Sequence, residues 1–140
     1  MTALDRAKTL LHGSIAIVVI RNGIVTTSEL KGIGALTEYA QSGTLNGASV
    51  ADKIVGKAAA LLMVYGKAKE VYAALITSDA MRIFERYNTP YAYFKVADKI
   101  LNRTGTGMCP MEQAVQTIND PQKALAAVIS QLQELQQKTF

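Results

Sequence analysis

The amino-acid sequence predicts a three-layer α/β/α sandwich around a four-stranded mixed sheet. Two β-branched runs joined by Asn-Gly predict a hairpin near the N-terminus, and short apolar strands alternate with helices after it. A hairpin followed by β-α-β units gives a sheet with antiparallel and parallel pairs and with helices on both faces. The 140 residues contain no linker, repeat or low-complexity segment, so we expect a single domain over 1–140.

The N-terminal elements follow from periodicity and turn residues. Residues 2–12 place apolar side chains on one face of a helix, which ends at the next glycine. The runs SIAIVVI (14–20) and IVTTS (24–28) are antiparallel strands, because the Asn-Gly between them tolerates positive φ at both central positions. Two glycines bound a second helix over 32–43.

The middle of the chain predicts a long helix and two further strands. Residues 50–65, VADKIVGKAAALLMVY, form a helix whose second half is apolar all round and is therefore buried against the sheet. The segments EVYAALI (70–76) and YAYFKV (91–96) are strands. A helix over 78–87, with Ser78 as its N-cap, connects them.

The C-terminal part predicts a loop and two helices. The loop 102–109 leads into a short helix that starts at Pro110, because proline is favoured at the first helical position. Asp120 and Pro121 start a last helix. The inner face of that helix consists of Leu125, Val128, Ile129, Leu132 and Leu135.

Composition narrows the classes of function. Charged residues make up 19% of the chain, below the usual share of about 25%, which indicates much buried surface and is consistent with a homo-oligomer interface. The net charge of +4 is scattered and lacks the basic runs of nucleic-acid binders, so it fits an anionic small molecule at least as well. No apolar run is long enough to span a bilayer, and the first segment is not a signal peptide. We expect a cytoplasmic protein with no membrane or nucleic-acid partner.

The single cysteine and the single histidine restrict metal chemistry. One cysteine excludes an internal disulfide, and His12 at the end of the first helix fits a favourable interaction with the helix dipole. The usual zinc ligand set is missing, so we expect no metal and no cofactor.

The candidate site lies at the carboxyl ends of the strands, where ligands bind in open α/β sheets. Helices starting at 50, 78 and 110 point their N-termini toward this end, which predicts an anion-binding pocket. The candidate ligand-binding residues are Lys53, Lys57, Asn102, Arg103, Thr104, Gly105, Thr106 and Gly107. The two lysines lie one turn apart on the predicted helix and either hold the anion or extend to solvent. The glycines of TGTG expose N–H groups that can hold an anion.

Three residues are candidates for catalysis. Asp52 and Glu112 lie three residues after the N-cap candidates Ser49 and Cys109, so they act either as acid/base groups or only as capping-box partners. Cys109 is a poor N-cap, and a thiol at a helix N-terminus near Arg103 has a stabilised thiolate. Cys109 is therefore a candidate nucleophile, and the alternative is a small buried apolar side chain.

Two motifs resemble a known family. The segments NGASVADKIVGKAAALL and ILNRTGTGMCPMEQAV, with EVYAALI between them, are similar to the prokaryotic family catalogued as domain of unknown function 1893, over about residues 4–130. The resemblance implies a cytidine-deaminase-like fold. Zinc deaminases have H-x-E or C-x-E at the start of the second core helix and P-C-x-x-C at the start of the third. Here Val50 replaces the first metal ligand, Asp52 resembles the acid/base carboxylate, and the segment TSDAM has no cysteine.

Three functions are compatible with these features. The first is a metal-independent enzyme that acts on a nucleotide-like or other anionic metabolite, with Cys109 as nucleophile and Asp52 or Glu112 as acid/base. The second is a ligand-binding or sensor protein that uses the same pocket without catalysis. The third is a residual zinc deaminase that uses Cys109 and carboxylates.

Overall fold

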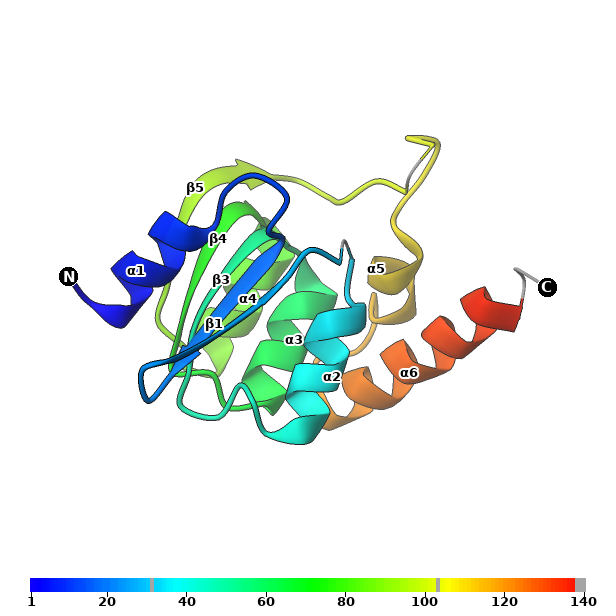
Figure 1. The fold of residues 1–140 in the computed structure, drawn as a ribbon. Coiled ribbons are helices and arrows are strands. Elements are labelled where there is room, and N and C mark those ends of the chain that lie inside the picture. Colours follow the sequence, from blue (N-terminus) through cyan, green and yellow to red (C-terminus); the bar gives the residue numbers. More distant parts are fainter. Residues whose placement is uncertain (31, 103, 138–140) are drawn as a thin grey trace.

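The computed structural model describes residues 1–30, 32–102 and 104–137. Helices and strands alternate along these residues, apart from two consecutive strands near the N-terminus and two consecutive helices at the end (Figure 1). The helices are α1 (Ala3–Leu10), α2 (Gly34–Ser42), α3 (Lys57–Tyr65), α4 (Ser78–Arg86), α5 (Pro110–Ala114) and α6 (Pro121–Gln137). The strands are β1 (Ile17–Arg21), β2 (Ile24–Ser28), β3 (Ser49–Val55), β4 (Glu70–Thr77) and β5 (Tyr91–Ala97).

The strands form one mixed sheet in the order β2-β1-β3-β4-β5. β1 pairs antiparallel with β2 and with β3, whereas β3, β4 and β5 run parallel. The prediction of a mixed sheet with antiparallel and parallel pairs is confirmed. The predicted number of strands is wrong, because the sheet has five strands and not four.

The additional strand is β3, where we predicted the first half of a helix over 50–65. Residues 49–55 are extended, Gly56 marks the break, and α3 begins at Lys57. Aspartate and lysine are depleted in strands, and the apolar residues on both sides of the glycine look like one continuous helix. Pairing outweighs this local preference, since β1 and β4 satisfy the backbone groups of β3 from both sides.

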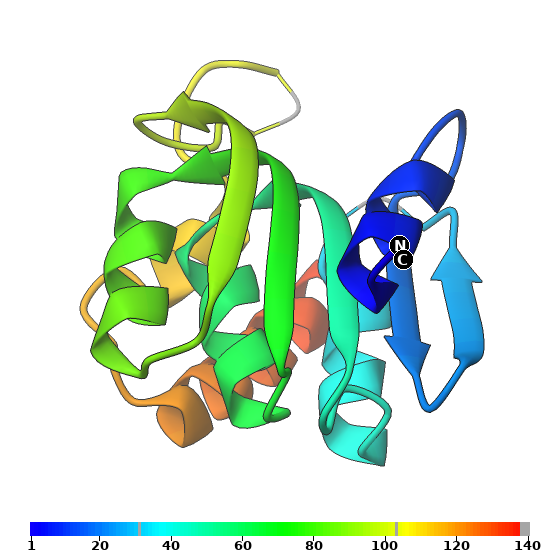
Figure 2. The same ribbon diagram turned by 90° about the vertical axis from the view of Figure 1, so that its left-hand side faces the viewer.

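Helices cover the two faces of the sheet unequally. On one face α1 packs Ala7 against Val18 and Ala51. The side chains of α2, α3 and α4 pack on the other face, and α6 packs against α3 from outside. Figure 2 shows α1 in front of the β1–β3 side of the sheet, from where it also contacts β4, whereas no described helix lies over β5 on this face. Phe94 of β5 is accordingly 81% exposed.

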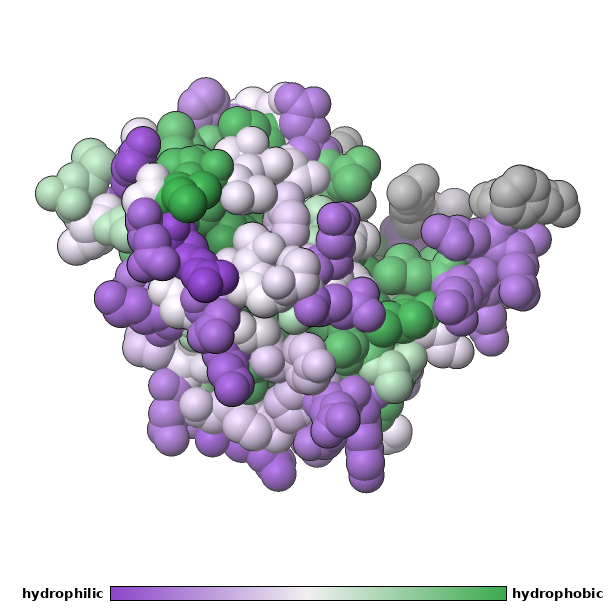
Figure 3. Space-filling model, turned by 60° about the horizontal axis from the view of Figure 1, so that its bottom comes forward, coloured by the Kyte–Doolittle hydropathy of each residue, from purple (hydrophilic) through white to green (hydrophobic). Residues whose placement is uncertain are grey.

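The helix α3 is enclosed on all sides. Every residue from 58 to 63 is buried, because α2, α4, α5 and α6 all contact this helix. The predicted burial of this apolar segment is confirmed. The predicted inner face of α6 is also confirmed, since Leu125 and Val128 are buried and the other three side chains pack against the same core. Figure 3 shows apolar side chains gathered where α6 leaves the body of the molecule.

Turn and capping predictions agree with the structure at most positions. Asn22 and Gly23 both have positive φ, at 51° and 77°, as an Asn-Gly hairpin turn requires. Asp120 accepts a hydrogen bond from the Lys123 amide at 2.9 Å and thereby caps α6. The predicted N-cap Ser78 is wrong by one residue, because the Thr77 hydroxyl accepts from the Ala80 amide at 3.2 Å. Within the described ranges, no helix is both long and apolar enough to cross a membrane.

Candidate functional site

A cavity of about 350 Å³ opens at the carboxyl end of β3. It lies between this strand, the start of β1, the segment that leads into α2, the first turn of α3, and the start of α5. Its lining residues are Ala16, Ile17, Leu30, Gly32, Ile33, Leu36, Asp52, Lys53, Ile54, Ala58, Ala59, Ile100, Cys109, Met111 and Glu112. The walls are therefore mostly apolar, and the volume lies at the lower end of the range of small-molecule pockets, roughly 300–1,000 Å³.

Asp52 brings a carboxyl group into this apolar cavity. It lies on β3 opposite Ile17 of β1. Like Val50, it faces the side of the sheet that α2, α3 and α4 cover. The Ile54 amide donates a long hydrogen bond of 3.4 Å to Oδ1. Burial raises the pKa of Asp52 to about 7, and the amides of Ile54 and Lys53 only partly offset this effect. Asp52 can therefore gain and lose a proton near neutral pH.

Glu112 has a different partner from the predicted one. Its Oε1 accepts from the Lys57 amide and its Oε2 from the Ala58 amide, both at 2.8 Å. Glu112 thus caps α3, a helix 55 residues earlier in the chain, and not its own helix. Gly56 makes this approach possible, because a Cβ at that position would lie 2.0 Å from Oε1. The carboxylate also interacts favourably with the positive end of the α3 dipole.

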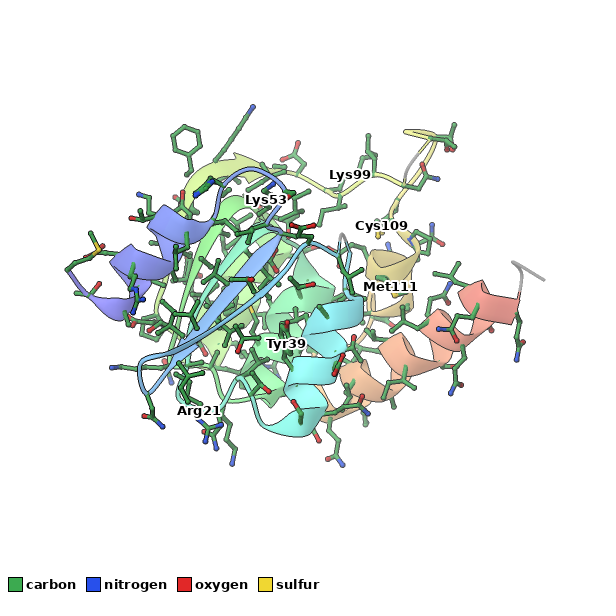
Figure 4. All side chains as sticks on the ribbon, in the orientation of Figure 1. Arg21, Tyr39, Lys53, Lys99, Cys109 and Met111 are labelled. Carbon is green, nitrogen blue, oxygen red and sulfur yellow. The ribbon has the colours of Figure 1, made fainter. Side chains whose placement is uncertain are left out.

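Cys109 lines the same cavity as Asp52. It occupies the N-cap position of α5, but its side chain makes no capping hydrogen bond. Its backbone amide donates to the Ile100 carbonyl at 2.9 Å, and the partly buried thiol contacts the core. Figure 4 shows Cys109 and Met111 at α5, across from Lys53 at the end of β3. The structure therefore brings the three candidate catalytic residues Asp52, Cys109 and Glu112 to the same cavity. The predicted N-cap Ser49 is wrong, because Ser49 lies on β3 and its hydroxyl donates to Glu70 at 2.5 Å.

The two lysines do not share a helix face, which corrects the sequence prediction. Lys53 is on β3, and its Nζ donates to the Gly13 carbonyl beyond the end of α1. Lys57 is the first residue of α3, and its Nζ donates to the Gln116 carbonyl at 3.1 Å. Each ammonium group is therefore held by a backbone carbonyl, although Lys53 is among the residues that line the cavity.

The loop between β5 and α5 closes on itself. The Asn102 Oδ1 accepts from the Thr106 amide at 3.0 Å and from the Thr104 hydroxyl at 3.1 Å. The backbone amide of Asn102 donates to the Gly107 carbonyl at 2.8 Å, and Gly105 forms the turn with a φ of 72°. None of these five residues lines the cavity in the described part of the chain. Arg103, also predicted to bind the ligand, lies outside the described residues.

The apolar walls were not predicted from the sequence. Leu30, Ile33 and Leu36 precede or begin α2, and Ile100 and Met111 flank the loop before α5. Such side chains have no chemical signature, and only the fold brings them together. Across the described residues, no three His, Cys, Asp or Glu side chains are grouped so that they could hold a metal ion.

A family model matches the part of the chain that contains all the described lining residues of the cavity. Residues 6–132 match the family model described as Domain of unknown function (DUF1893). The chain is also similar to the crystal structure of a DUF1893 family protein from Thermotoga maritima, with a TM-score of 0.77 and 26% sequence identity. This similarity covers 83% of this chain and 80% of that chain. No curated protein matches the chain.

Glu112→Ala should destabilise the protein, because it leaves two α3 amides without an acceptor. We expect a loss of about 1–3 kcal/mol in the free energy of unfolding, measured by urea denaturation. Glu112→Gln should lose less, since its amide oxygen can still accept one bond. Glu134→Ala, on the exposed side of α6, is the matched control and should change stability by less than about 0.5 kcal/mol. Equal losses for Glu112→Ala and the control would contradict the capping role.

Asp52→Asn should stabilise the protein in a pH-dependent manner. The folded-state pKa of Asp52 is raised from 3.8 to about 7, so the parent protein loses stability as the pH rises through this window. The substituted asparagine cannot ionise, and the stability difference should grow by about 2–4 kcal/mol between about pH 4 and about pH 8. Asp98→Asn, in an exposed position after β5, controls for the loss of one charge. A stability difference between Asp52→Asn and the parent that stays constant with pH would exclude a buried, uncompensated Asp52.

Proposed function

Because the chain belongs to the family described as Domain of unknown function (DUF1893), a description that assigns no reaction, we propose its function from the cavity itself. The protein binds a small organic molecule between β3, α2, α3 and α5. The observation that carries this proposal is the carboxyl group of Asp52, which lies in an otherwise mostly apolar cavity of about 350 Å³. Burial at this place raises the pKa of Asp52 to about 7.

The position of Asp52 supports a ligand-binding role. An aspartate with a raised pKa destabilises the folded protein at neutral pH, so Asp52 does not contribute to the stability of β3 under these conditions. Perturbed carboxyl groups in clefts are concentrated at functional sites. The apolar walls supply the driving force for an organic ligand, and the carboxyl group orients it.

A reaction without a metal is the second candidate function. Asp52 has the pKa of a general acid or base that works near neutral pH, and the thiol of Cys109, which lines the same cavity, can act as a nucleophile. Glu112 is not an acid/base group in this proposal, because the α3 amides occupy both of its oxygens. A sensor without catalysis would use the same cavity, and turnover of a bound ligand distinguishes the two.

The proposal keeps the cytidine-deaminase-like scaffold that the family resemblance implies, but not its zinc chemistry. The motifs of zinc deaminases lie at the starts of the second and third core helices. α3 starts with Gly56-Lys57-Ala58 and α4 follows Thr77, so His and Cys are missing from both starts. Asp52 resembles the acid/base carboxylate in sequence, but it lies on β3 and not at the start of a helix.

Indole, a small neutral aromatic probe, tests the binding function. Added indole should shift the backbone NMR signals of Ile33, Ile54 and Met111 and slow the alkylation of Cys109 by iodoacetamide. Ala59→Leu extends a side chain from α3 into the cavity and should weaken binding roughly tenfold or more. Ala126→Leu, the same change at an exposed position on α6, should leave binding unchanged.

A second filling variant guards against misfolding of the first. Ile54→Phe narrows the mouth of the cavity at a side chain that is 50% exposed, so the fold should tolerate it. Indole that binds both filled variants as tightly as the parent, or that shifts no cavity signal in the parent, would overturn the proposal.

A further inference from the structure

We propose that the cavity selects ligands that carry a positive charge or an amine donor and rejects anionic ligands. The proposal rests on the binding function above and assigns the class of ligand. It reverses the expectation of an anionic ligand, which came from the scattered lysines and the glycine-rich loop.

The charged side chains of the described lining do not offer a cation to the ligand. In the described part of the lining, the lysine is Lys53. Its ammonium group donates to the Gly13 carbonyl. Lys57 directly precedes the lining residue Ala58, but its ammonium group donates to the Gln116 carbonyl. Among the residues that the structure describes, the other charged groups of the lining are the carboxyl groups of Asp52 and Glu112.

Two of the features that predicted an anion site, the helix start at α3 and the glycine-rich loop, already have hydrogen-bond partners within the protein. The first two amides of α3 donate to the Glu112 carboxylate at 2.8 Å, so an anionic ligand would have to displace this side chain. The Thr106 amide in the glycine-rich loop donates to the Asn102 side chain at 3.0 Å. An anion at the start of α3 would therefore compete with the Glu112 carboxylate, and the ionised Asp52 would repel it.

Asp52 is the acceptor that remains for a ligand. The dipole of α3 and two short hydrogen bonds compensate Glu112, whereas the Ile54 amide reaches Asp52 only at 3.4 Å. The amides of Ile54 and Lys53 offset the effect of burial on the pKa of Asp52 only partly. A cation beside an aspartate in apolar surroundings is attracted more strongly than in water, because little solvent screens the pair. A protonated amine or an amidine would supply the donors that Asp52 lacks.

The charge of Asp52 predicts how binding changes with pH. A cation binds the ionised carboxyl, and burial raises the pKa of Asp52 to about 7. Affinity for a permanent cation should therefore increase as the pH rises from about 5.5 to about 8.5. Within the described residues, the other titratable groups that line the cavity are Glu112 from α5, Cys109 before α5 and Lys53 from β3.

Three probes of nearly the same shape test the proposal: benzamidine, benzamide and benzoate, which are cationic, neutral and anionic. At about pH 8.5, calorimetric titration should give roughly tenfold or tighter binding of benzamidine relative to benzamide. Benzoate should bind at least about tenfold more weakly than benzamide. Asp52→Asn should remove the advantage of benzamidine and leave benzamide unchanged, whereas Asp98→Asn, the exposed control, should keep it.

The outcomes separate this inference from the binding function. Benzamide that binds while benzoate binds equally well or better overturns the charge selection and leaves the binding function intact. A benzamidine advantage that survives in Asp52→Asn, or that does not change with pH in the parent, also overturns it. Failure of all three probes to bind, together with failure of indole, refutes the binding function and this inference with it.

Discussion

The carboxylate of Glu112 joins the start of α5 to the start of α3, and the shape of the cavity depends on this contact. Its two oxygens accept from two consecutive α3 amides, and Gly56 leaves the space for them. Since Cys109 and Met111 are close to Glu112 in sequence, the contact also fixes where these side chains border the cavity. A helix that receives its cap from a distant segment thereby forms one wall of a binding site.

The second constraint is the central position of β3. Because β3 pairs with β1 on one side and β4 on the other, the register holds Asp52 opposite Ile17. The strand cannot move Asp52 out to solvent without breaking these pairs. The carboxyl group is therefore kept among apolar side chains, where burial raises its pKa to about 7. Rigid placement of an unfavourable group is what a binding or catalytic site requires.

Local patterns predicted much of the fold and little of the site. The hairpin and the apolar face of α6 follow from interactions within a few residues, and both were predicted. β3 was missed because long-range pairing, and not local preference, makes it a strand. The contact between Glu112 and the α3 amides was likewise missed, because these residues are far apart in the chain and no short motif links them. The glycine-rich loop suggested an anion cradle, but the Asn102 side chain in the same loop accepts from the Thr106 amide and the Thr104 hydroxyl.

Direct titration of the Asp52 carboxyl carbon by NMR tests the central claim, that the cavity holds an ionisable group for a cationic ligand. The account predicts a midpoint of about 7 in the free protein and a lower midpoint in the presence of saturating benzamidine. The direction follows because a bound cation favours the charged carboxylate. A midpoint near the ordinary aspartate value of about 3.9, unchanged by benzamidine, would contradict the account.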